Sequence, residues 1–194
     1  KQRVPFYEAD DEAAFYGPKI DIQMKNVLGK EDTAFTVQYD FVMPKRFEMT
    51  YIGKDGEEKE PVVIHRSSIG ALERVLAFLI EHYKGNFPVW LAPQQVEIIP
   101  ISDDHLDYAD QIKEMFIKEG IRTEVNEKDA TMGAKIRDAQ QHKIPYMVIV
   151  GDKEVENKTI SVRLRSGEQH QGLKPQEVLE KIKNIYLTKS LKLW

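Results

Sequence analysis

The chain has 194 residues, 41% of them hydrophobic and 31% charged, with a formal net charge of −4, and these values are typical of a soluble globular protein of one or two domains. It contains no cysteine, which excludes disulfides and a cysteine-based zinc cage within this sequence and agrees with a reducing, cytoplasmic location. No apolar run approaches the roughly 20 residues of a membrane span, and the negative charge argues against indiscriminate polyanion binding while leaving room for a local basic face.

The first half of the chain predicts strands followed by one helix. Residues 19–23 are compatible with a strand, and residues 35–41 are rich in β-branched and aromatic side chains. An Asp-Gly pair at 55–56 predicts a hairpin over residues 48–65. The pattern then becomes helical over about residues 68–83, so strands followed by a helix laid across them are expected.

The segment 63–74 changes from an apolar strand pattern to this helix. Apolar side chains at 69, 72, 75, 76, 79 and 80 form a stripe that should face a core, which directs Arg74 the other way. Gly70 lies one turn from Arg74, so something could approach closely beside its guanidinium. An arginine there suits stacking on a purine or pairing with a phosphate. From spacing alone, a surface arginine on an amphipathic helix is the simpler interpretation.

Residues 85–93, with two prolines and one glycine, predict a linker, and Phe87 and Trp90 indicate a packed joint. Beyond it, strand and helix patterns alternate. Strands are expected at 96–101, 121–125, 146–150 and 158–165, the last reached through a tight Gly151-Asp152 turn, and helices at 104–119, 131–141 and 175–186. This alternation predicts parallel pairing with helices on both faces of a sheet.

Five segments in series resemble the threonyl-tRNA synthetases, a family of class II aminoacyl-tRNA synthetases. Residues 65–74 resemble the third class II signature motif, and the others are residues 14–20, 36–41, 87–93 and 150–155. The resemblance implies part of an antiparallel class II catalytic sheet over residues 1–84, the linker 85–93, and an anticodon-binding domain over residues 94–194. That domain is α/β, with a mixed, mainly parallel five-stranded sheet.

The resemblance also implies a threonine–tRNA ligase, which activates L-threonine with ATP and transfers it to tRNA(Thr), as a homodimer with no membrane association. The chain begins at Lys1 instead of Met and lacks the first and second signature motifs, so a piece of a longer enzyme, inactive alone, is expected. The alternatives are a non-catalytic RNA-binding or regulatory paralogue and an accessory subunit.

In the catalytic part, the resemblance implies catalytic roles for Arg74 and Lys19, and a threonine and ATP pocket formed by Tyr16, Lys19, Gln38, Gly70 and Arg74. Asp40 is expected to orient the site. His65 matches the third ligand of a Zn²⁺ that would coordinate the amino group and hydroxyl of threonine, and ATP would bring Mg²⁺. Two departures, residues 10–13 and Thr33, put some nucleotide contacts in doubt.

In the second part, Gly151 to Glu154 follow a predicted strand at the edge where α/β sheets bind ligands. Glu154 could accept from guanine N–H groups and Arg163 could donate to bases or phosphate, since anticodon bases are unstacked. A cross-strand Glu154–Arg163 ion pair is the alternative. Lys135 and Arg137 lie near a helix start, where an external anion would offset the helix dipole. The full set of expected anticodon contacts is Glu154, Arg163, Lys135, Arg137, Lys153 and Asp129.

Overall fold

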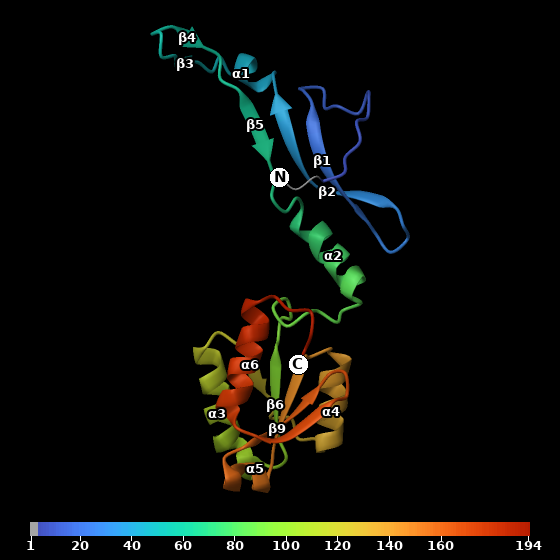
Figure 1. Ribbon diagram of the computed structural model, residues 1–194, viewed down its shortest axis with the longest axis vertical. Coiled ribbons are helices and arrows are strands. Elements are labelled where there is room, and N and C mark those ends of the chain that lie inside the picture. Colours follow the sequence, from blue (N-terminus) through green and yellow to red (C-terminus); the bar gives the residue numbers. More distant parts are fainter. Residues whose placement is uncertain (1–3) are drawn as a thin grey trace. The chain divides into compact units, whose positions relative to one another are not determined.

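The structure is a computed structural model that describes residues 4–194. Residues 1–3, the start of the expected 1–84 domain, lie outside the described residues. The chain forms two compact units that divide between His82 and Tyr83 (Figure 1). Within the described part, no helix is both long enough and apolar enough to cross a membrane.

The first unit is built on a three-stranded antiparallel sheet of order β1-β2-β5. Its strands are β1 (Lys19–Lys25), β2 (Glu31–Asp40) and β5 (Val63–Arg66). β2 lies in the centre and hydrogen-bonds to both neighbours. The antiparallel class II sheet expected from the resemblance is therefore confirmed.

The predicted hairpin over residues 48–65 is wrong in extent. Only β3 (Tyr51–Ile52) and β4 (Glu58–Lys59) pair with each other, across the turn where the Gly53 N–H donates to the Glu57 carbonyl at 2.8 Å. β5 leaves this ribbon and pairs with β2 instead. Pro61, which has no N–H to offer a ladder, lies between β4 and β5. A short helix, α1 (Met43–Arg46), precedes the ribbon and was not predicted.

The helix that closes the first unit is α2 (Leu72–Tyr83), which begins later than predicted. Gly70 has a left-handed φ of +72°, which helical residues do not adopt, and its N–H donates to Ser67 Oγ at 2.7 Å. The expectation that the apolar stripe faces a core is wrong for the described chain. Leu72, Leu76 and Ile80 are 68%, 51% and 47% exposed, because no described element covers this face of α2.

The second unit is built on a mixed five-stranded sheet of order β10-β9-β8-β6-β7. Its strands are β6 (Val96–Pro100), β7 (Thr123–Val125), β8 (Tyr146–Val150), β9 (Ile160–Leu164) and β10 (Gln169–Leu173). β6 runs parallel to β7 and β8, whereas β9 and β10 are added antiparallel. The mixed α/β sheet is thus confirmed, with the parallel pairing restricted to β7, β6 and β8.

Helices cover both faces of this sheet. α3 (Leu106–Lys118), which follows the short helix η1 (Asp103–His105), and α6 (Pro175–Leu187) lie over one face, and α4 (Met132–Gln141) lies over the other (Figure 1). Side chains alternate along β6 accordingly. Ile98 packs into the core shared with α3 and α6, and Ile99 packs with Ala139 of α4.

Two elements of this unit were not predicted. The expected tight turn at Gly151-Asp152 is instead the start of a one-and-a-half-turn helix, α5 (Asp152–Asn157). Six residues were too few for a periodic pattern to show in the sequence. β10 is an edge strand with the polar start Gln-His-Gln, so it lacked the apolar pattern that marks a strand.

Candidate functional site

The three strands of the first unit place expected substrate residues in one row. Lys19 on β1 pairs directly with Gln38 on β2, and Gln38 pairs directly with His65 on β5. Directly paired residues project from the same face of a sheet. Residues 46 positions apart in sequence, from Lys19 to His65, therefore lie side by side, and the sheet register produces this arrangement.

Tyr16 joins this row from the segment that precedes β1. Its hydroxyl donates to Gln38 Oε1 at 2.6 Å. The segment lies against β2 because the Tyr39 N–H donates to the Pro18 carbonyl at 3.0 Å and the Phe41 N–H to the Tyr16 carbonyl at 2.9 Å. Gly17 has a φ of +153°, and a Cβ there would lie 2.1 Å from the Tyr39 carbonyl oxygen. A glycine is therefore required for Tyr16 to reach Gln38.

His65 is held by a buried carboxylate. Its Nε2 donates to Asp40 Oδ2 at 2.7 Å, and Asp40 Oδ1 accepts the N–H groups of Val42 at 2.8 Å and Met43 at 2.9 Å. Burial by itself would raise the pKa of Asp40, but these hydrogen bonds outweigh it and hold the pKa below its ordinary value. The charged Asp40 carboxylate therefore orients the His65 ring.

Lys19, at one end of the row, forms an ion pair with a neighbouring carboxylate. Its Nζ lies 2.7 Å from Asp21 Oδ2, and this hydrogen bond raises the pKa of Lys19. The two residues are separated by one position along β1, so they project from the same face. A cationic amine is thus kept beside Gln38.

Arg74 and Gly70 lie at a different part of β2. Arg74 Nη1 donates to the Thr33 carbonyl at 3.1 Å, five positions along the strand from Gln38. A Cβ on Gly70 would lie 2.1 Å from the Ala34 carbonyl oxygen. The close approach that the glycine was expected to permit is therefore made by the backbone of β2. The structure does not bring Arg74 into the row of Lys19, Gln38 and His65.

Among residues 4–194, no group of three or more His, Cys, Asp and Glu side chains is arranged to hold a metal ion. His65 nevertheless has the chemistry of a ligand. Its Nε2 is engaged with Asp40, which leaves Nδ1 as the nitrogen with a free lone pair. A carboxylate behind a histidine is the usual outer partner of a zinc ligand. His65 therefore fits one position of a zinc site.

In the second unit, Glu154 lies on α5 with both carboxylate oxygens engaged. Oε2 accepts the Gly151 N–H at 3.1 Å, and Oε1 accepts the hydroxyl of Ser161 at 2.8 Å. Burial first, and then the negative charge of Glu154, raise the pKa of Tyr108, whose hydroxyl donates to the Thr159 carbonyl at 3.1 Å. The Glu154 carboxylate is thus a fixed acceptor at the carboxyl end of β8.

Arg163 lies on β9, two positions beyond Ser161, so both side chains project from the same face of the sheet. The alternative of a cross-strand ion pair is wrong, because Glu154 is on a helix and no ion pair joins it to Arg163 among the described residues. The Nε of Arg163 is buried and has no hydrogen-bond partner. A buried donor without an acceptor is costly, so this nitrogen is under-satisfied in the folded chain.

The remaining residues that were expected to contact the anticodon differ in solvent exposure. Lys153, Asp129 and Arg137 are exposed, and Asp129 lies between β7 and α4, at the same sheet edge as Glu154. Lys135 does not meet an external anion as expected. It is 7% exposed, and its Nζ donates to the carbonyls of Asn126 at 3.0 Å and Pro100 at 3.3 Å. Its ammonium group is therefore hydrogen-bonded within the fold, where it links α4 to β6.

Comparisons with known proteins match both units. The family profile "tRNA synthetase class II core domain (G, H, P, S and T)" matches residues 2–83, and "Anticodon binding domain" matches residues 95–185. The chain is 52% identical to the threonine–tRNA ligase of Staphylococcus carnosus over 184 residues, covering 94% of this chain and 28% of the relative. It is 56% identical to that of a Geobacillus species over 165 residues, covering 84% and 26%. A solved RNA-binding domain of threonyl-tRNA synthetase from Cryptosporidium parvum is 33% identical with a TM-score of 0.76, covering 89% of this chain and 44% of that one.

The chain belongs to the threonyl-tRNA synthetase family. It corresponds to the C-terminal region of these enzymes, comprising the end of the class II core and the anticodon-binding domain. It spans about 28% of the length of the Staphylococcus carnosus relative.

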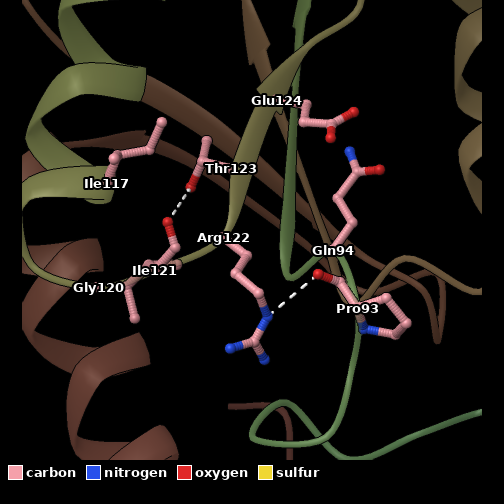
Figure 2. Close-up of a pocket in the computed structure, with 8 residues that line it drawn as sticks. All are labelled: Pro93, Gln94, Ile117, Gly120, Ile121, Arg122, Thr123 and Glu124. Atoms are coloured by element: carbon pink, nitrogen blue, oxygen red, sulfur yellow. Dashed lines mark hydrogen bonds between the residues drawn. The ribbon is translucent and has the colours of Figure 1, made fainter.

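Two pockets of this threonyl-tRNA synthetase region have no expected site residue in their lining. One, of about 470 Å³, is lined by Pro93, Gln94, Ile117, Gly120, Ile121, Arg122, Thr123 and Glu124 (Figure 2). The other, of about 270 Å³, includes Glu97, Asn126 and Asp138.

Ser161 was missed by the sequence reasoning. It lies two residues before Arg163 on a strand, and that spacing alone places both on one face. Its bond to Glu154 could not be foreseen, because α5 was predicted to be a turn.

Proposed function

We propose that the whole protein is a threonine–tRNA ligase and that this chain supplies its third signature motif and its anticodon recognition. The observation that carries the RNA part is the pair of opposite groups on neighbouring elements, a fixed Glu154 carboxylate on α5 and an Arg163 guanidinium with an unpartnered Nε on β9. A base edge in an unstacked anticodon loop offers donors and acceptors to such a pair. The names and 52% identity of the relatives support the ligase assignment.

In the proposed reaction, the carboxylate of L-threonine attacks the α-phosphorus of ATP, and pyrophosphate leaves to give threonyl-adenylate. A hydroxyl of the terminal ribose of tRNA(Thr) then attacks the acyl carbon, and AMP leaves. Mg²⁺ would accompany ATP and offset its phosphate charge. The product is an ester between threonine and the tRNA.

The row on the first unit supports threonine binding. We assign Tyr16 and Gln38 to orientation of the amino acid and Lys19 to the negative charge of the adenylate. Arg74 is assigned to the adenine ring of ATP, where a guanidinium can stack on a purine. In this assignment the hydrogen bond from Arg74 to the Thr33 carbonyl, at 3.1 Å, holds the guanidinium group in position for stacking.

For the zinc, we assign His65 as one protein ligand, backed by Asp40 at 2.7 Å. The other protein ligands would come from outside this chain. Bound there, zinc would supply open coordination positions for the amino group and hydroxyl of threonine, and valine lacks that hydroxyl. A homodimeric, cytoplasmic enzyme remains part of the proposal.

The RNA assignment is tested with tRNA(Thr) transcripts that carry either the matched or an altered anticodon. Arg163→Ala should weaken the matched tRNA roughly 10- to 100-fold, because a base-reading contact is worth about 1–3 kcal/mol. The altered tRNA should lose much less. Affinities measured at two salt concentrations separate this outcome from a phosphate contact, which would weaken both tRNAs equally and flatten the salt dependence.

Arg46→Ala, at an exposed arginine of α1, is the matched control and should change neither affinity. Unchanged affinities of Arg163→Ala for both tRNAs would show that the anticodon assignment is wrong.

A further inference from the structure

Ser161 is the side chain that fixes Glu154 from the sheet. Its hydroxyl donates to Glu154 Oε1 at 2.8 Å, while the Gly151 N–H donates to Oε2 at 3.1 Å. The two donors come from different segments, Ser161 from β9 and Gly151 from the position between β8 and α5. One donor on each oxygen defines the plane of the carboxylate.

This arrangement leaves acceptor capacity for a ligand. An ionised carboxylate has about four lone-pair sites, and the protein uses two of them. Without the hydroxyl, the terminal torsion of Glu154 would be broad and roughly two-fold. Gly151 would then hold one oxygen while the other swings, so the direction of the remaining lone pairs would no longer be defined.

Ser161 also connects Glu154 with Arg163. Ser161 pairs with Ile149 and Arg163 with Met147, so the serine and the arginine follow each other along one face, roughly 6–7 Å apart at the backbone. The Arg163 Nε on this face is buried and unpartnered. The chain therefore places three groups in succession, from α5 onto β9: the Glu154 carboxylate, the Ser161 hydroxyl and the Arg163 guanidinium.

We propose that Ser161 is a positioning residue for base discrimination, which holds the Glu154 carboxylate so that its free lone pairs and the Arg163 guanidinium meet the same RNA base edge. This inference rests on the proposed anticodon recognition and adds a residue to it. Ser161 acts through Glu154 and makes no base contact of its own.

A purely structural role for the serine makes a different prediction. The bond also links α5 to β9, so its loss could loosen this corner of the unit. That would lower the midpoint of thermal unfolding and weaken all tRNAs in parallel. A positioning role instead changes the ratio between the affinities for the matched and the altered anticodon.

The experiment measures that ratio and the unfolding midpoint for the full chain carrying Ser161→Ala, Ser161→Thr or Arg163→Ala. Ser161→Ala should lower the ratio about fivefold to tenfold, the scale of one intramolecular hydrogen bond. Ser161→Thr keeps the hydroxyl and suits a strand, so it should restore the ratio. Should the alanine variant fail to fold, Ser161→Cys, a weak donor of similar size, replaces it with the same expected loss.

The outcomes are distinct. A ratio that stays at the wild-type value in Ser161→Ala but falls in Arg163→Ala overturns the role of Ser161 and leaves the proposed function standing. Parallel loss of both affinities with a lower unfolding midpoint assigns the serine a structural role and also overturns the inference. A ratio unchanged in both variants overturns the proposed anticodon recognition together with it.

Discussion

At the scale of single residues, buried charges in the second unit have different consequences. Lys135 is buried but donates to two carbonyls, so its ammonium group is accommodated by the backbone. Glu97 is 7% exposed, and its Oε1 accepts from Asn126 Nδ2 at 2.6 Å, while Gln94 Nε2 lies 3.5 Å from its Oε2. A single good hydrogen bond is enough for a neutral carboxylic acid at a buried site, but it leaves a charged carboxylate with too few partners.

Burial raises the pKa of Glu97 despite the Asn126 hydrogen bond that lowers it. The folded chain therefore binds this proton more tightly than the unfolded chain does. Folding stability is lost as the pH rises from the ordinary value of 4.5 through the higher folded pKa, and at neutral pH the charged Glu97 opposes folding.

Glu97→Gln should therefore stabilise the chain at pH 7, because the amide keeps the acceptor for Asn126 and removes the buried charge. We expect a gain on the order of 1 kcal/mol, which corresponds to roughly 4–8 °C in the unfolding midpoint of a unit of this size. Thermal unfolding at pH 7 and below pH 4.5 measures it, and the gain should vanish at the lower pH. Glu114→Gln, at an exposed position of α3, is the control. An equal or lower midpoint for Glu97→Gln at pH 7 would contradict the argument.

At the scale of elements, the predicted linker, residues 85–93, belongs structurally to the second unit. Gln95 is fully buried, with Nε2 donating to the Val89 carbonyl at 2.7 Å and Oε1 accepting the Arg122 N–H at 2.8 Å. The Arg122 guanidinium donates to the carbonyls of Ala92 at 2.8 Å and Pro93 at 3.1 Å, and the second of these bonds is visible in Figure 2. Arg165 donates to the Phe87 carbonyl at 2.6 Å. Side chains of the second unit thus hold the segment 85–93 against it.

Gln95→Leu should be strongly destabilising, because an apolar side chain of similar size leaves the Val89 carbonyl and the Arg122 N–H unpaired. We expect a loss of about 2–4 kcal/mol in the free energy of unfolding, measured by urea denaturation. Arg122→Ala, at an exposed arginine, should cost less. The same substitution one residue earlier, Gln94→Leu, removes only contacts of 3.4 and 3.5 Å and should be nearly neutral. Equal losses for Gln94→Leu and Gln95→Leu would show that the buried amide does not hold the segment.

At the scale of the whole molecule, the first unit presents apolar surface that the described chain does not cover. Leu72, Leu76 and Ile80 on α2 and Ile20 and Ile64 on the sheet are each 47% exposed or more. The second unit, in contrast, has a core on both faces of its sheet. The two units therefore differ in how much of their stability this chain can supply by itself.

A further prediction at this scale concerns catalysis. The 194-residue chain should show no threonine-dependent ATP–pyrophosphate exchange and should hold no zinc, because it carries one signature motif and one fitting zinc ligand. Retained tRNA binding would show that the same preparation is folded. Exchange above background that Arg74→Ala abolishes would contradict the prediction. In the full-length protein, His65→Ala should reduce bound zinc, and unchanged zinc content would remove His65 from the site.

The sequence by itself determined the elements with a clear apolar pattern, such as the amphipathic helix α3 and the apolar strands β6 and β8, and the order of the two units. It also indicated Tyr16, Lys19, Gln38 and His65 through motif resemblance, since each motif is local. Only the tertiary structure decided that three of them share a row, because strand register depends on pairing between distant segments. The same dependence explains why Lys135 is internal, why Gly70 faces β2 and why Ser161 meets Glu154. Burial and hydrogen-bond partners are set by which elements pack together, and a linear pattern does not contain that information.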